Sequence, residues 1–348
     1  MTGVAVTMPA PRERWRGIVA ASDTALPEQV PEWVDAVCAS KRYTDLSRLY
    51  VFDDGTEAVL PLVRRRGPAG IGGSLQSFPP AWGIGGLLSA RALSARQVRD
   101  VLGDLRRQRA QRVWIRPDPV AASAWRAAAG AAGATLVPRR AHVLELAPGR
   151  DAVWAGLSQT GRRNVRLARR SGVEVVSAHS GALLDEYYGL FLSSVDRWAE
   201  HQHEPRPLAR ARARRRDPLA KLAAMGKHLG EDFVVTLCRV DGVAVAGVVV
   251  LYGRTAHGTR AAMDRERLGR SHASELACWT SIELALERGC TAFHMGESGG
   301  STELARAKEK FGAHPVDYAE VRLERLPWTR ADGVLRAGVK RVIGFRDD

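Results

Sequence analysis

Two basic segments carry more positive charge than folding alone requires. Residues 161–175 read Gly-Arg-Arg-Asn-Val-Arg-Leu-Ala-Arg-Arg-Ser-Gly-Val-Glu-Val, which indicates an arginine-rich helix that ends at a glycine and enters a strand. Residues 305–312 read Ala-Arg-Ala-Lys-Glu-Lys-Phe-Gly and put two lysines just before a Phe-Gly turn. Because a folded core needs neither set of charges, the first expectation is a partner that bears phosphate.

A glycine-rich turn supplies candidate acid–base groups. Residues 293–300 read Phe-His-Met-Gly-Glu-Ser-Gly-Gly, a strand that runs into a turn. Glu297 or His294 could accept a proton from an attacking amine. Strand alternation places them on opposite faces, so we do not expect them to act together. The alternatives are a core histidine with satisfied hydrogen bonds and an ordinary loop carboxylate.

Two further segments could contact ligands. Residues 78–86 form a loop rich in proline, glycine and aromatic residues, in which glycines allow close backbone approach and Trp82 offers a stacking surface. A tight loop with a packed tryptophan is the alternative. The arginine run 210–216 lies among prolines and is typical of a mobile, solvated loop. Arg214, Arg215 and Arg216 in this run are candidate phosphate contacts.

The elements that must position these residues recur in two halves. The first half predicts helices at 31–40, 94–108 and 121–132, with strands at 47–52, 57–64, 113–116 and 142–146. The second predicts helices at 151–157, 162–171, 181–200, 219–229 and 274–288. Its strands are predicted at 173–177, 233–240, 243–252, 255–263, 291–295 and 318–323, and a basic amphipathic helix at 331–343. Helix, hairpin, strand, helix and strand in each half imply two similar α/β (α+β) domains around mixed sheets.

Composition narrows the class of protein. The chain has 348 residues, 45% of them hydrophobic and 26% charged, as expected for an ordinary globular protein with two cores. It contains no apolar run long enough to span a membrane and no secretion signal, so a cytoplasmic location is the expectation. The four cysteines lack metal-ligand spacing, and no metal is expected. A net charge of +14 favours a phosphorylated or nucleic-acid partner.

The order of these landmarks resembles the Fem-type aminoacyl transferases, which are built on the acetyltransferase (GNAT) fold. The Ala-Lys-Glu-Lys-Phe-Gly motif is similar to the family's Phe-Lys-x-x-Phe-Gly signature, with Ala307 in place of the first phenylalanine. The resemblance implies two tandem GNAT-like domains with mixed sheets flanked by helices. We expect them at 1–147 and 148–327, the second with the transfer site, followed by the basic helix at 328–348.

The resemblance also implies roles for individual residues. Lys308 is expected to stabilise the oxyanion or the departing ribose when an amine attacks an aminoacyl ester, with Glu297 as the second catalytic residue. The alternative for Lys308 is a solvated side chain at a strand end. The remaining residues are candidates for substrate contact: Trp82, Gly85, Gly86, His294, Ser298 and Phe311.

The candidate acyl-CoA loop is a poor match to the pattern of classical acetyltransferases. It reads Glu-Arg-Leu-Gly-Arg-Ser at 266–271, with an acidic first position and a serine in place of the last glycine. An aminoacyl-tRNA donor, which needs no cofactor, is therefore preferred to acyl-CoA. Expected contacts with its phosphates are Arg162, Arg163, Arg166, Arg270 and the arginines at 214–216.

Three functions remain open from the sequence. The first is an aminoacyl-tRNA-dependent transferase that forms an amide on an amine-bearing small molecule or peptide-like acceptor, such as a cell-wall precursor or a natural product such as an antibiotic. The second is an acyl-CoA-dependent N-acyltransferase of the same fold. The third is a non-catalytic module that binds RNA or anions. Nothing in the sequence identifies the oligomeric state.

Overall fold

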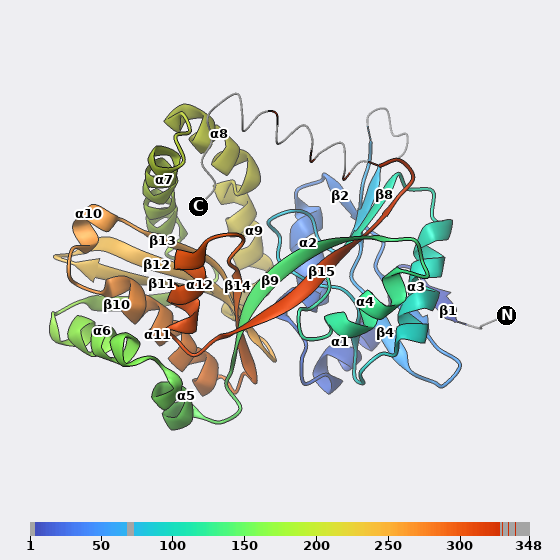
Figure 1. The fold of residues 1–348 in the computed structure, drawn as a ribbon, viewed down its shortest axis with the longest axis horizontal. Coiled ribbons are helices and arrows are strands. Elements are labelled where there is room, and N and C mark those ends of the chain that lie inside the picture. The colour runs from blue at the N-terminus through green and yellow to red at the C-terminus, as the bar shows by residue number, and fades with distance from the viewer. Residues whose placement is uncertain (1–3, 68–72, 328, 330–332, 334–337, 339–348) are drawn as a thin grey trace. The chain divides into compact units, whose positions relative to one another are not determined.

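The computed structural model describes residues 4–67 and 73–327, with residues 329, 333 and 338 (Figure 1). The chain divides into two compact units: unit 1 contains residues up to 141 and from 316 to 328, and unit 2 contains residues 142–315. Each unit combines helices with a mixed sheet, so the predicted α/β class is confirmed. The helix predicted at 331–343, within the expected terminal segment 328–348, lies outside the continuously described residues.

Unit 1 begins with helices and ends with a strand that returns from the far end of the chain. Its helices are α1 (Arg12–Ala21), the 3-10 turn η1 (Pro27–Gln29), α2 (Pro31–Ala39), α3 (Ala95–Arg107) and α4 (Ala122–Ala129). Its strands are β1 (Ala5–Thr7), β2 (Tyr43–Asp45), β3 (Arg48–Val51), β4 (Glu57–Leu60), β5 (Val63–Arg65), β6 (Ser74–Gln76), β7 (Leu88–Ser89), β8 (Arg112–Ile115) and β15 (His314–Glu324). Strand β9 (Thr135–Glu145) starts in unit 1 and ends in unit 2.

The sheets of unit 1 explain one departure from the predicted strands. β4 pairs with β3 and β7, whereas β5 pairs with β2 and β6. The strand expected at 57–64 is therefore two strands in different sheets, separated at Pro61, because proline lacks the N–H that would continue the ladder. β6 runs parallel to β8, and β8 pairs antiparallel with β15.

The core of unit 1 lies between its sheet residues and helix α3. Helix α3 begins at Ser94, whose Oγ accepts a hydrogen bond from the amide of Gln97. Its buried side chains Val98, Val101 and Leu102 pack with residues of the strands such as Leu75 and Val113. The helix that the serine cap and the apolar spacing predict at 94–108 is confirmed.

Unit 2 supplies the helices and strands that surround the sequence motifs. Its helices are α5 (Arg150–Gly156), α6 (Gln159–Arg170), α7 (Leu184–His201), α8 (Arg206–Arg216), α9 (Leu219–Leu229), the 3-10 turn η3 (Gly230–Asp232), α10 (Arg265–Leu268), α11 (Ala273–Glu287) and α12 (Thr302–Glu309). Its strands are β10 (Glu174–His179), β11 (Phe233–Val240), β12 (Val243–Leu251), β13 (Ala256–Met263) and β14 (Ala292–Glu297). β10 to β13 are antiparallel neighbours in sequence order, and β14 pairs parallel with β13.

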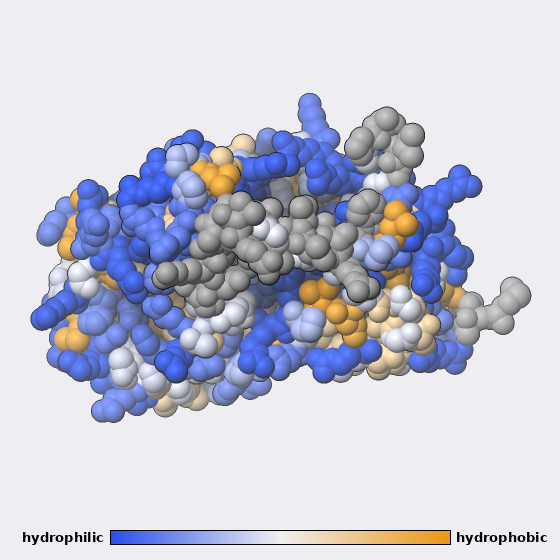
Figure 2. Space-filling view, turned by 45° about the horizontal axis from the view of Figure 1, so that its top comes forward, coloured by the Kyte–Doolittle hydropathy of each residue, from blue (hydrophilic) through white to orange (hydrophobic). Residues whose placement is uncertain are grey.

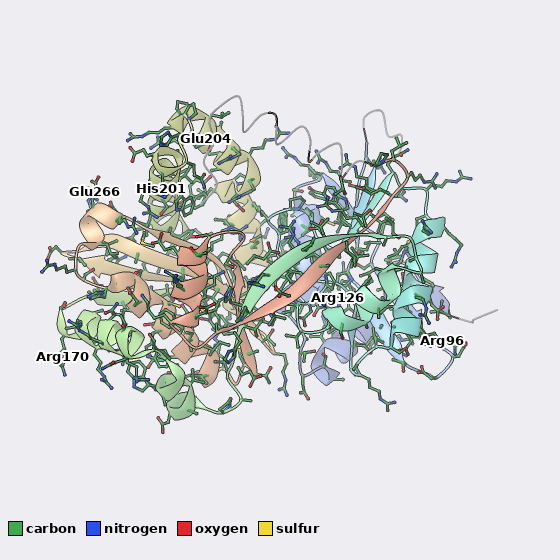
Figure 3. The ribbon with its side chains drawn as sticks, in the orientation of Figure 1. Arg96, Arg126, Arg170, His201, Glu204 and Glu266 are labelled. Carbon is green, nitrogen blue, oxygen red and sulfur yellow. The ribbon has the colours of Figure 1, made fainter. Side chains whose placement is uncertain are left out.

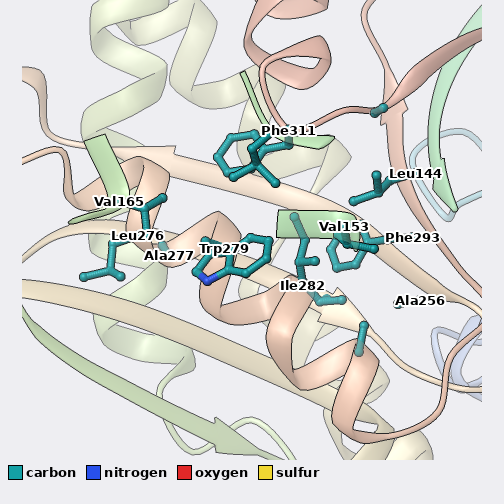
Figure 4. Packing of buried hydrophobic residues seen from close by; sticks show 14 of the residues in the cluster. Leu144, Val153, Val165, Ala256, Leu276, Ala277, Trp279, Ile282, Phe293 and Phe311 are labelled. Atoms are coloured by element: carbon teal, nitrogen blue, oxygen red, sulfur yellow. The ribbon is translucent and has the colours of Figure 1, made fainter. Parts of the chain in front are cut away.

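One face of the unit 2 sheet packs on helix α11 around Trp279. The side chain of Trp279 is buried and lies 4.7 Å, centroid to centroid, from that of Trp154. Figure 4 shows Trp279 and Phe311 among the aliphatic side chains of the same cluster, including Val153, Val165 and Ile282. This core fixes α6, α11 and the segment after α12 relative to the sheet within the unit.

The arginine run 210–216 is helical, so the predicted loop is wrong. It belongs to α8, which follows its N-cap Pro205 and has Pro207 in its first turn, where a missing N–H costs nothing. Ala209 and Ala213, four residues apart, are buried, and α8 packs beside α7 (Figure 1). Arginine and alanine are strong helix formers, and this narrow alanine contact suffices to dock the helix.

Candidate active site

The parallel strands β13 and β14 pair over a short stretch only. Ala256 pairs with Phe293 and His257 with His294, and the pairing then ends while both strands continue. No residue pair of the two strands lies beyond His257 and His294 in the described chain. Gly296, with φ of +72°, turns the chain at this point, a conformation that favours glycine.

Lys308 of α12 binds the end of β14. Its Nζ donates hydrogen bonds to the carbonyl oxygens of Gly296 at 2.9 Å and Glu297 at 2.7 Å. The residue is 7% exposed, so it is not the solvated lysine of the alternative interpretation. Burial lowers the pKa of Lys308 to about 8, although the charge of Glu297 acts in the opposite direction.

An ammonium held in this way has one donor left for chemistry. Lysine carries three N–H groups, and the two carbonyls use two of them. Such a fixed, poorly solvated cation can stabilise negative charge that develops on a reacting oxygen. With a pKa of about 8, Lys308 is mostly protonated at neutral pH and can also release a proton at modest cost.

The turn after β14 holds Lys308 in place. Ser301 caps α12, because its Oγ accepts a hydrogen bond from the amide of Leu304. The carbonyl of Ser298, a buried residue, accepts from the amide of Ser301 at 3.1 Å. Glu297 therefore lies beside Lys308, because its backbone carbonyl is one of the two acceptors, and Ser298 follows it in the same turn.

His294 and Phe311 are interior residues of unit 2. The ring of His294 is 2% exposed and lies 6.2 Å from that of His257. Burial, with a smaller contribution from His257, lowers the pKa of His294 to about 3, so its protonated form is strongly disfavoured. Phe311 packs in the cluster of Figure 4. His294 is thus a core histidine as in the alternative, but its Nδ1 is buried without a hydrogen-bond partner among the described residues.

The second lysine of the motif has a different contact. Lys310 Nζ donates to Oε1 of Glu275 at 3.2 Å, and Asn164 of α6 donates to the same oxygen at 2.8 Å. The amide of Ser158, the cap of α6, donates to the carbonyl of Lys310 at 2.9 Å. This network joins α6, α11 and the end of α12, and sequence reasoning missed Asn164 and Glu275. The one signal was a lone amide among the arginines of the basic helix.

The Trp82 loop belongs to the interior of unit 1. Trp82 is buried and meets Trp33 edge to face at 5.7 Å. A Cβ atom at Gly85 would lie 2.2 Å from the ring of Phe78, and Gly86 has a φ of +89°. These contacts account for the glycines and the tryptophan through packing. The role of Trp82, Gly85 and Gly86 in acceptor binding stays a prediction.

The arginines of α6 divide into paired and exposed groups. Arg162 donates to the carbonyls of Ala155 and Leu157 and so ties α6 to the end of α5. Arg166 lies over the ring of Trp154 at 5.5 Å, with its side chain exposed. Arg163 is also exposed, and Figure 3 shows Arg170 pointing away from the end of α6. The exposed set forms a basic ridge along one helix.

The other predicted phosphate contacts lie elsewhere in unit 2. Arg214 and Arg215 are exposed on α8, whereas Arg216 donates to Asp217 at 3.0 Å. Arg270 is exposed in the turn between α10 and α11. The face drawn in Figure 2 is largely hydrophilic, with small separate hydrophobic patches. Arg162 and Arg216 therefore make contacts within the protein, although the Arg216 side chain is also exposed.

A buried charged cluster was missed from the sequence. Asp217, 1% exposed, accepts hydrogen bonds from Lys221 at 3.0 Å and Arg260 at 3.1 Å. Burial raises the pKa of Asp217, but Arg260 and Lys221 outweigh it and lower the pKa to about 2. Burial also lowers the pKa of Lys221 to about 7. The only signal was a lysine at an apolar position of α9, because Arg260 lies 43 residues from Asp217.

Two absences among the described residues concern metal binding and membrane spanning. Within residues 4–67 and 73–327, no three His, Cys, Asp or Glu side chains gather in a way that could hold a metal ion. No helix in the part of the chain that the structure describes is long and apolar enough to cross a membrane.

Comparison with known proteins identifies the fold. The family described as an acetyltransferase (GNAT) domain matches residues 155–303, which contain β13, β14 and the start of α12. A crystal structure of FemX superposes with a TM-score of 0.70 at 12% identity, over 91% of this chain and 96% of that one. A search of curated protein sequences gives no match.

Two other solved structures superpose less closely. The C-terminal domain of a putative lysylphosphatidylglycerol synthetase from Agrobacterium fabrum has a TM-score of 0.54 at 12% identity, covering 94% of this chain and 95% of that one. A protein of unknown function from Bacteroides thetaiotaomicron has a TM-score of 0.53 at 13% identity, with 92% and 98% covered. The chain therefore has a Fem-type, GNAT-like acyltransferase fold.

Proposed function

We propose that this chain, which has the Fem-type GNAT-like fold, is an aminoacyl-tRNA-dependent transferase that forms an amide bond on an amine-bearing acceptor. The observation that carries the proposal is the buried ammonium of Lys308 at the end of β14, held by two carbonyl groups. The acceptor is a small molecule or a peptide-like precursor of the cell wall or of a natural product. No cofactor is needed, because the ester of the donor is already activated.

The reaction balances without an oxidant or a metal. The acceptor nitrogen attacks the ester carbonyl carbon, a C–N bond forms, and the C–O bond to the ribose breaks. The departing ribose oxygen takes up a proton as the amine nitrogen loses one. The remaining N–H group of Lys308 stabilises the oxyanion or the ribose oxygen, and the Glu297 carboxylate is the proposed proton acceptor. Positioning of the two substrates supplies much of the remaining rate enhancement.

The exposed arginines support a donor that carries many phosphates. Arg163, Arg166 and Arg170 form the ridge along α6, and Arg270 lies before α11. Contacts of this kind bind the RNA backbone independently of sequence and weaken as salt is added. Shape and phosphate contacts, rather than base stacking, would dominate recognition.

An acyl-CoA donor is the second candidate, supported by the match of residues 155–303 to the acetyltransferase domain. The position of one carboxylate argues against an acyl-CoA donor. Glu275, in the first turn of α11, keeps a negative charge there, because Asn164 and Lys310 lower its pKa although burial raises it. A carboxylate at a helix N-terminus competes with the pyrophosphate that acetyltransferases bind at such a position.

Donor choice tests the proposal. The protein is incubated with candidate amine acceptors and either a pool of labelled aminoacyl-tRNAs, with and without RNase, or labelled acetyl-CoA. We expect transfer from the RNA pool that RNase abolishes, and loss of transfer in Lys308→Ala but not in Lys227→Ala, which removes an exposed lysine of α9. Transfer from acetyl-CoA alone would establish the second candidate. RNA binding without transfer in the wild type would leave only a binding module.

A further inference from the structure

The helices α7 and α8 form an antiparallel hairpin with a ladder of ion pairs. Residues 202–205 connect them, and the buried Glu204 in this connection accepts from Arg212 at 2.6 Å (Figure 3). On the neighbouring side of α8, Arg206 pairs with Glu200, and Arg210 donates from Nε to Asp196 at 2.6 Å. Each step moves four residues forward on α8 and four back on α7, as expected for antiparallel helices.

At the third position of this series, α8 carries an arginine but α7 carries no acidic residue. Continuing the pattern places Arg214 opposite Leu192, a residue that cannot accept a hydrogen bond through its side chain. Arg214 is exposed, and none of the ion pairs among the described residues includes it. The ladder therefore ends in a guanidinium whose charge the neighbouring helix does not neutralise.

A hollow of about 430 Å³ runs beside this ladder. Its lining consists of Asp196 from α7 with Arg206, Pro207, Arg210, Ala211 and Arg214 from α8. The three arginines recur every fourth residue and so share one side of the helix. A volume of this size falls in the range of small-molecule sites. The one acidic group in the lining is already bonded by Arg210, which lowers the pKa of Asp196.

We propose that this hollow is a binding site for a phosphate ester group, held mainly by Arg214 with Arg210 as its neighbour. A guanidinium presents N–H groups in a fork that matches the oxygens of phosphate. Arg210 uses one edge for Asp196 and keeps further N–H groups on its other edge. The phosphate replaces the acid that is missing opposite Arg214, so it completes the ladder.

The inference concerns binding alone and does not depend on the donor of the transfer reaction. The phosphate could belong to an RNA backbone or to a phosphorylated small molecule, since the chemistry at Arg214 is the same. The proposal gives different roles to the arginines of the run 210–216. Arg212 and Arg216 bind acidic residues of the protein, and Arg214 lines the hollow.

Two neighbouring substitutions test the site. Arg214→Gln and Arg215→Gln remove the same charge from adjacent exposed positions of α8, but only Arg214 lines the hollow. Binding of adenosine 5′-monophosphate and of a short RNA hairpin is measured by calorimetry at several salt concentrations, with thermal unfolding as the check on folding. We expect Arg214→Gln to weaken binding of at least one probe about tenfold or more, and Arg215→Gln to weaken it less than about twofold.

The two probes distinguish the sources of the phosphate. A selective loss with the mononucleotide identifies a small phosphorylated ligand. A selective loss with RNA alone, with a salt slope lower by about one, identifies a backbone phosphate. Asp196→Asn, which removes the acid that binds Arg210, should tighten binding of the same probe several-fold. Equal effects of Arg214→Gln and Arg215→Gln on both probes, or no binding of either probe by the wild type, would overturn the proposal.

Discussion

Among the described strands, and with β9 set aside, each unit has one pair of parallel strands, and the two pairs end differently. In unit 1, β6 and β8 pair from Ser74 with Arg112 to Gln76 with Trp114. Beyond the strands, Ser77 Oγ accepts from the amide of Arg116 at 2.9 Å, and the amide of Gly85 donates to the carbonyl of Arg116 at 2.8 Å. The protein's own loop therefore closes this pair.

In unit 2 the corresponding end remains open to a side chain. The pairing of β13 with β14 stops at His257 and His294, and Lys308 binds the carbonyls of Gly296 and Glu297 at the end of β14. A loop backbone that closes a strand pair offers no mobile proton, whereas an ammonium does. Similar pairs of parallel strands are therefore structural in unit 1 and form the candidate reaction centre in unit 2.

Removal of the Lys308 ammonium at the β13–β14 pair should have the largest effect on turnover. We expect Lys308→Ala to lower the turnover number of aminoacyl transfer about 10²- to 10³-fold, the usual effect of losing one donor to an oxyanion. The matched control is Lys227→Ala on the exposed side of α9, which should leave turnover unchanged. Turnover of Lys308→Ala within twofold of the wild type would remove Lys308 from the mechanism.

A change in the turn that presents the carbonyls should have the next largest effect. Gly296 has a φ of +72°, so Gly296→Ala introduces about 1–2 kcal/mol of backbone strain and displaces an acceptor of Lys308. We expect turnover to fall about tenfold. Gly242→Ala is the control, because Gly242 has a φ of +75° in the hairpin between β11 and β12 and carries equal strain without contact to Lys308. Similar turnover in the two variants would contradict the model of a positioned lysine.

The pH dependence of unfolding should distinguish the open pair from a solvated lysine. The pKa of Lys308 is about 8 in the folded chain and 10.5 ordinarily, so between these values the unfolded chain binds more protons. The free energy of unfolding should therefore rise from pH 8 to pH 10.5 through this group, and the contribution should be absent below pH 8. Lys308→Met should abolish this component of the rise in urea titrations. A rise of equal size in wild type and Lys308→Met would assign it to other groups.

Disruption of the β6–β8 pair should lower the free energy of unfolding without changing turnover. Ser77→Ala removes the acceptor of the Arg116 amide and should lower the free energy of unfolding by about 1–3 kcal/mol, the cost of leaving a buried donor unsatisfied. Turnover per folded molecule should not change. Ser193→Ala, at an exposed position of α7, is the control for both measurements. Loss of turnover in Ser77→Ala at full folding would show that the unit 1 pair also takes part in transfer.

Some elements were predictable because their signals are local. Asp241-Gly242 between two apolar runs predicted the β11–β12 hairpin, and the helical spacing of the apolar positions of α3 predicted that helix. The Lys308 motif was also recognisable from its neighbours along the chain. These predictions depend on residues within one or two turns of each other.

Two of the helices that the sequence did not reveal, α8 and α12, have unusual buried faces. The one buried side chain of α12 is Lys308 itself, and Leu304 is exposed, so hydrophobic periodicity carries no signal there. On α8 the buried positions are two alanines among arginines. Long-range contacts, such as that of Asp217 with Arg260, have no local pattern at all.

The network around Lys310 joins the basic helix α6 to the segment that carries Lys308. Lys310 is two residues from Lys308, and its carbonyl receives the amide of Ser158 at the start of α6. A Cβ atom at Gly161 would lie 2.9 Å from that carbonyl, so α6 packs directly against the Phe-Gly turn. The start of α6 is therefore bonded to the backbone two residues away from Lys308.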